Sequence, residues 1–124
     1  MTQFISTKTE NDALLITMEV DEMKDSQQCY DIRDAMIAAQ KEAGIDKIAI
    51  NMARVSFMGS IGILAFLGLR RVVDEHQGRI VFYNLSAQLI GMLKVCKLIS
   101  NDPHWKSPFG YAETVESAQE LLAS

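Results

Sequence analysis

The run KIAINM at residues 47–52 constrains the fold more than any other segment of the chain. It is short, apolar and bounded by turn-forming neighbours, which is typical of a strand whose two faces are both covered. Other elements must then pack on both sides of the sheet that contains this strand. We therefore interpret the run as a central strand.

The segment before this strand is predicted to hold a hairpin and a helix. Residues 4–8 and 14–20 resemble two strands joined by the polar turn at residues 10–12. A capping-box pattern begins at Asp25 and is followed by apolar residues with the spacing of one buried helical face. Gly44 supplies the expected end of this helix.

The segment after the central strand continues the alternation of helices and strands. Ser60 precedes an apolar-rich helix that runs to about His76, and residues 79–84 are predicted as another strand. Ser86 and Thr114 can each cap a further helix. This order favours an α/β fold, with a small mixed sheet of about four to five strands and about four helices packed on it.

The length of 124 residues fits a single domain over residues 1–124. One irregular stretch, from Asn101 to Tyr111, is long for a connection within a small domain. It contains Trp105 and Phe109, and its aromatic residues are interpreted either as a local cap over the core or as contacts for a partner.

Charge and hydropathy exclude several classes of partner. The net charge of −4 and the lack of a dense Lys/Arg block argue against nucleic acid. The longest apolar stretch, Ile61 to Leu69, is too short to span a bilayer, and no secretion leader is recognised, so we expect a cytoplasmic protein without direct membrane insertion. Cys29 and Cys96 are isolated and are expected to pack in helices as small apolar groups.

The residues that catalysis or metal binding would need do not form a motif. His76 and His104 are far apart in sequence, and neither belongs to a recognisable nucleophilic triad or zinc site. The pattern Gly59-x-x-Gly62 lacks the additional residues of a dinucleotide or nucleotide loop. We therefore expect no enzyme activity, metal or cofactor, and we interpret Gly62 and Gly68 as points of close helix packing.

The turn that contains Ser60 is the strongest candidate for a functional site. Ser60 should lie at a helix N-terminus, where unpaired N–H groups and the helix dipole favour an oxygen acceptor or a phosphate. A simple N-cap role for Ser60 is the alternative. The following helix is apolar almost all round for two turns. This pattern fits burial between the sheet and another helix, or a partner contact that includes Phe57 or Met58.

Residues 48–62, with the sequence IAINMARVSFMGSIG, closely resemble the signature of STAS domains, the sulfate-transporter and anti-sigma-factor-antagonist family. The resemblance extends over residues 14–98. It implies a STAS fold that acts as a switchable, non-catalytic binding module in bacterial regulation. In the antagonist branch, a serine at the position of Ser60 is phosphorylated by an anti-sigma factor that is an ATP-using serine kinase. The expected partner-binding residues are Phe57, Met58, Gly59, Ser60, Ile61, Gly62 and Leu64.

The chain departs from the family pattern beside this serine. Gly59 and Arg54 stand where the family commonly has acidic residues, and Ile61 replaces a residue that is often small and polar. These departures favour a second hypothesis, a scaffold or accessory subunit that docks on a transporter ATPase or signalling assembly without phosphorylation. Self-assembly as a homodimer and a role as a small-ligand or nucleotide module are also left open.

Overall fold

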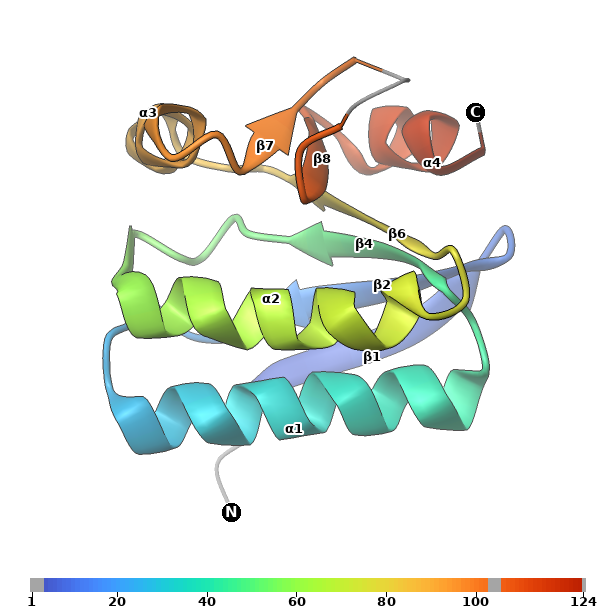
Figure 1. The fold of residues 1–124 in the computed structure, drawn as a ribbon, viewed down its shortest axis with the longest axis horizontal. Helices are drawn as coiled ribbons and strands as arrows, with labels where there is room; N and C mark the ends of the chain where they lie inside the picture. The colour runs from blue at the N-terminus through green and yellow to red at the C-terminus, as the bar shows by residue number, and fades with distance from the viewer. Residues whose placement is uncertain (1–3, 103–105, 124) are drawn as a thin grey trace.

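A mixed sheet of six strands, in the order β1-β2-β4-β6-β8-β7, forms the centre of the fold (Figure 1). The computed structural model describes residues 4–102 and 106–123. β1 is antiparallel to β2, and the other neighbouring strands are parallel. The predicted α/β fold with a mixed sheet is therefore confirmed. The strands are β1 (Ile5–Glu10), β2 (Ala13–Met18), β4 (Lys47–Asn51), β6 (Arg79–Tyr83), β7 (Ile99–Ser100) and β8 (Phe109–Ala112).

β4 is covered on both faces, as its sequence predicts. Ile48 and Ile50 belong to the larger core cluster, whereas Ala49 belongs to a smaller cluster on the opposite face. β6 alternates in the same way, with Phe82 in the larger cluster and Val81 in the smaller one. Because successive side chains of a strand point to opposite faces, both central strands bury every second residue in each cluster.

Within the described residues, four helices cover the two faces of the sheet (Figure 1). The larger core cluster contains buried residues of three of them, and the fourth contributes Ala118 and Leu122 to the smaller cluster. The layers are therefore unequal, with three helices on one face and one on the other. The helices are α1 (Ser26–Ala43), α2 (Ser60–Asp74), α3 (Ala87–Val95) and α4 (Val115–Ala123).

The helix caps predicted by local sequence rules are present in α1, α3 and α4. The Asp25 carboxylate accepts a hydrogen bond from the Gln28 amide at 2.8 Å, and Gly44 ends α1 with a φ of 66°. The Ser86 hydroxyl accepts from the Leu89 amide at 3.1 Å. Thr114 caps α4 in the same way, through a 3.1 Å bond from the Ser117 amide.

Part of the stretch predicted to be an irregular loop is β-structure. β8 begins at Phe109, and β7 ends immediately before Asn101, so the sheet has more strands than the predicted four to five. Phe109 is buried, with its ring centroid 4.9 Å from that of Phe82, while Tyr111 is half-buried. Phe109 is thus part of the core. His104 and Trp105 lie outside the described residues, so the interpretations of these two residues stay predictions.

The two cysteines lie in different environments. Cys29 is buried in α1 as predicted, and its burial, followed by the charge of Asp25, raises the pKa of its thiol. Cys96 is exposed, so the expectation that it packs inward is wrong. α3 ends at Val95, and Cys96 occupies the C-cap, where the continuing helical face no longer covers it.

None of the helices within the described residues is both long and apolar enough to cross a membrane.

We predict that a thiol-specific maleimide labels only one of the two cysteines of the native protein. Cys96 should react because it is exposed, and Cys29 should react only in denaturant. Mass spectrometry of digested protein checks this, with Cys96→Ser as the control that should remain unlabelled when folded. Rapid labelling of native Cys29 would contradict the packing of α1.

Phe82→Ala should lower the free energy of unfolding by about 3–5 kcal/mol, because the substitution removes the contacts of Phe82 with two other rings and leaves a cavity in the core. Phe66 and Phe109 lie with ring centroids 5.0 and 4.9 Å from Phe82. Val95→Ala is the control, because Val95 is 83% exposed, and its effect should stay within about 0.5 kcal/mol. Urea denaturation measures both, and similar losses for the two variants would contradict this core.

Candidate functional site

Ser60 is the first residue of α2 rather than its N-cap, so the capping interpretation is wrong. Gly59 occupies the N-cap, and its carbonyl accepts from the amides of Gly62 at 3.0 Å and Ile63 at 3.2 Å. Glycine has no side chain that could accept a hydrogen bond from the first helical amides. The Ser60 side chain is exposed, and within the described part of the chain it forms no hydrogen bond.

The electrostatic environment of Ser60 favours an anion. The dipole of α2 places partial positive charge at this end, and the first turn contains no acidic residue that would offset it. With no side-chain cap, backbone amides remain available to solvent or to an incoming acceptor. The predicted position of Ser60 at a helix N-terminus is therefore confirmed, and its hydroxyl is free to react or to contact another molecule.

A two-stranded parallel ladder that the sequence analysis missed holds this turn in place. β3 (Glu22–Met23) pairs with β5 (Phe57–Met58). The Gly59 amide donates to the Met23 carbonyl at 2.9 Å, and the Ser56 amide donates to the Asp21 carbonyl at 2.8 Å. The chain immediately before α2 is thereby fixed to the chain immediately before α1. Each strand has only two residues, too few to show a periodic pattern.

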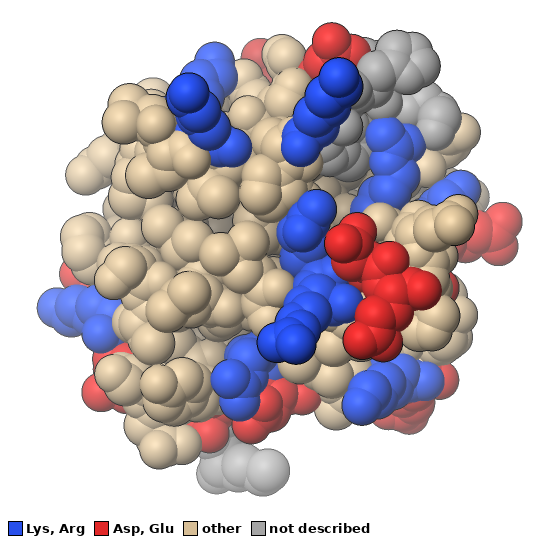
Figure 2. Space-filling view, viewed as in Figure 1, with Lys and Arg blue, Asp and Glu red and all other residues tan. Residues whose placement is uncertain are grey.

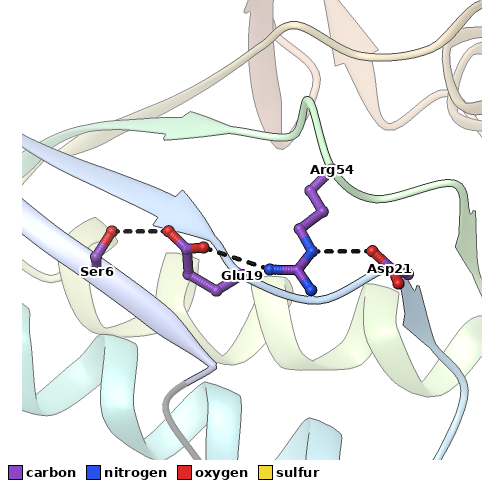
Figure 3. A network of polar contacts seen from close by, with 4 residues as sticks. All are labelled: Ser6, Glu19, Asp21 and Arg54. Atoms are coloured by element: carbon purple, nitrogen blue, oxygen red, sulfur yellow. Dashed lines mark hydrogen bonds and ion pairs between the residues drawn. The ribbon is translucent and has the colours of Figure 1, made fainter.

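Arg54 belongs to a polar network beside the ladder (Figure 3). Its Nε donates to Asp21 Oδ1 at 2.9 Å, and its Nη1 lies 3.5 Å from Glu19 Oε2. Glu19 also accepts a 3.1 Å hydrogen bond from the Ser6 hydroxyl. The hydrogen bond with Asp21, then its charge, raises the pKa of Arg54. The network therefore links the loop before Ser60 to β1 and to the end of β2.

Gly62 allows the first turn of α2 to lie directly against the ladder. A Cβ at this position would lie 2.6 Å from Met58 Cγ and 3.0 Å from Met23 Cβ, well inside normal contact distance. Gly62 is buried, and Met58 is only 2% exposed. The expectation that both contribute to an exposed surface is wrong. They support the turn from inside, whereas the interpretation of Gly62 as a close-packing glycine is confirmed.

The remaining predicted contact residues do reach the surface. Phe57 is 43% exposed and Leu64 is 57% exposed, while Gly59 and Ile61 are half-buried. Figure 2 shows a broad area without charged residues around the beginning of α2, with Lys and Arg side chains along part of its border. We call Phe57, Ser60 and Leu64 the α2 entry surface. It combines a free hydroxyl with two exposed apolar side chains.

Gly68 also permits close approach between helices, as predicted. A Cβ there would lie 2.8 Å from Cδ of Arg33, which comes from α1. The described residues contain no cluster of three His, Cys, Asp or Glu side chains that could hold a metal ion.

Comparison with known proteins identifies relatives of this fold. The model of the STAS domain family matches residues 5–109. The anti-sigma factor antagonist SpoIIAA in its unphosphorylated form is 20% identical, with a TM-score of 0.66 over 97% of this chain and 98% of that chain. The phosphorylated form of the Bacillus cell fate determinant SpoIIAA is 23% identical, with a TM-score of 0.65 over 94% and 96% of the two chains.

A third solved structure has a higher structural similarity at lower identity. A putative anti-sigma factor antagonist from Thermotoga maritima is 12% identical, with a TM-score of 0.74 over 97% of this chain and 95% of that chain. No match is found among curated proteins. The solved structures therefore agree with the fold, and the family match covers the whole α2 entry surface.

Gly62→Ala should destabilise the protein by about 1–3 kcal/mol, because the added methyl group has no space beside Met58 and Met23. Gly91→Ala is a matched control in α3, where a Cβ meets nothing within 4 Å. It should stabilise the protein by about 0.4–1 kcal/mol, because alanine has fewer unfolded conformations than glycine. Urea denaturation compares the two, and a stabilising Gly62→Ala would contradict the seating of α2 on the ladder.

Proposed function

Because the chain belongs to the STAS domain family, we propose that it is a cytoplasmic regulatory module of the anti-sigma factor antagonist type. In this proposal it is not an enzyme. It binds an anti-sigma factor that is a serine kinase, and the α2 entry surface forms the contact. Phosphorylation of Ser60 then switches the binding off.

The observation that carries this proposal is the free, exposed Ser60 hydroxyl between exposed apolar groups. A docked partner would cover Phe57 and Leu64 and remove their apolar surface from water. A phosphate on Ser60 would add about −1.5 to −2 charges to the same surface. A hydrated dianion cannot be buried against an apolar contact without a large desolvation cost, so one modification would be enough to oppose docking.

The start of α2 also offers favourable electrostatics for the modified state. The N-terminal end of the helix dipole stabilises negative charge, and no carboxylate in the first turn competes with it. The phosphorylated protein would consequently stay folded while its contact surface changed. That SpoIIAA, a structural neighbour, has been solved in phosphorylated and unphosphorylated forms is compatible with a switch that preserves the fold.

A second function, constitutive docking without phosphorylation, is favoured by two residues of the same turn. Gly59 supplies no carboxylate beside Ser60, and Arg54 is engaged by Asp21 and Glu19. A kinase that recognises carboxylates at these two positions would find no acidic side chain at either Gly59 or Arg54. In this alternative the α2 entry surface binds a transporter ATPase, a signalling assembly or a second copy of the chain.

Incubation with a candidate anti-sigma kinase and ATP tests the first function. We expect mass spectrometry to place phosphate on Ser60 and to find none in Ser60→Ala. Ser56→Ala is the matched control, because Ser56 is exposed on the same turn but its hydroxyl donates to the Asp21 carbonyl at 3.1 Å. This variant should still be phosphorylated.

Binding measurements separate the two functions. Ser60→Asp should bind the partner of the wild-type protein at least about tenfold more weakly. Docking would bury the new carboxylate, and this should make the free energy of binding less favourable by more than about 1.4 kcal/mol. If Ser60→Asp binds as tightly as the wild type and Ser60 accepts no phosphate, the switch is excluded and constitutive docking is supported.

A further inference from the structure

A groove of about 1170 Å³ lies between α3 and α4, away from the α2 entry surface. Its floor includes Ala53, Asn84 and Ala112, which lie at or just beyond the carboxyl ends of three neighbouring strands, β4, β6 and β8. In Figure 1, α3 and α4 lie on either side of β8.

The topology of the sheet creates this groove. β6 is followed by α3, whose buried residues Leu89 and Leu93 join the larger core cluster. The adjacent parallel strand β8 is followed by α4, whose Ala118 and Leu122 join the cluster on the opposite face. Two neighbouring strands therefore send their helices to opposite faces. In open α/β sheets, a crevice outside the carboxyl ends of such strands is the usual place for a ligand.

The two walls of the groove carry opposite charges. Lys94 lies on the α3 side, with its ammonium group 5.4 Å from the centroid of the Tyr111 ring. Glu120 lies on the α4 wall, and Glu113 precedes the same helix. Ile90 of α3 and Leu121 of α4 add apolar surface to the lining of the groove. A ligand that matches this arrangement has an apolar body, a carboxylate for one wall and an ammonium group for the other.

The floor of the groove is fixed by one side chain. Asn51 Oδ1 accepts hydrogen bonds from the Ala53 amide at 3.0 Å and from Asn84 Nδ2 at 3.2 Å. Asn84 has a φ of 59°, a left-handed conformation that is uncommon outside glycine. Ala53 directly precedes Arg54, so a molecule on this floor would touch the loop that leads to the α2 entry surface.

We propose that the groove is a binding site for a small zwitterionic amphipathic molecule, such as a short peptide with free ends and aliphatic side chains. Its carboxylate would pair with Lys94 and its ammonium group with Glu120. The groove is somewhat larger than the range of about 300–1,000 Å³ that is usual for small-molecule sites, so it has room for several residues of such a peptide. This proposal stands independently of phosphorylation at Ser60.

Titration of the full chain with trileucine, followed by two-dimensional NMR of backbone amides, tests the proposal. We expect saturable shifts at groove residues, including Ala53, Asn84 and Leu121. The same peptide with an acetylated N-terminus and an amidated C-terminus is the matched probe, and it should bind about tenfold more weakly, because it lacks both charges and so loses both ion pairs.

Lys94→Gln and Glu120→Gln should each weaken trileucine binding by about threefold, the effect of losing one exposed ion pair. Glu75→Gln is the control at the end of α2, and it should leave the affinity unchanged. Absence of saturable shifts at the groove would overturn the proposal. Equal affinity for the free and blocked peptides would also overturn it, because the site would then not recognise a zwitterion.

Discussion

The contact between Gly62 and the β3–β5 ladder determines how the rest of the site is arranged. The absence of a side chain lets the backbone of α2 approach Met23 and Met58 more closely than any other residue type would allow. This approach fixes the rotation of the helix about its axis. As a result, Gly62, Ala65 and Phe66 point inward while Ser60 and Leu64 point outward. The free hydroxyl is thus a consequence of packing on the opposite side of the helix.

Those parts of the structure that follow local rules could be predicted from the sequence. Caps at Asp25, Ser86 and Thr114 depend on residues within one helical turn, and the strand predicted at residues 47–52, observed as β4, is apolar and buried at residues 48–50. The parts that depend on pairing between distant segments could not. β3, β5 and β7 contain two residues each, and they exist because a neighbouring strand completes their hydrogen bonds.

The same limit explains which site residues were predicted correctly. Ser60 could be placed at the start of a helix because the change from strand to apolar helix is a local signal. The side of the turn on which Met58 lies depends on its pairing with Met23, and nothing in the surrounding sequence encodes that contact. Arg54 likewise departs from the family pattern in sequence, but its charge is matched within this chain by Asp21 and Glu19.

The ladder also has a consequence for the order in which the protein folds. It joins segments separated by α1 and β4, so closing it in an otherwise unfolded chain would cost more conformational entropy than two residue pairs return. Because of this cost, we expect the ladder to form only after α1 and β4 have docked, and to open before they separate. We therefore expect the start of α2 to open locally at a lower free-energy cost than global unfolding of the core.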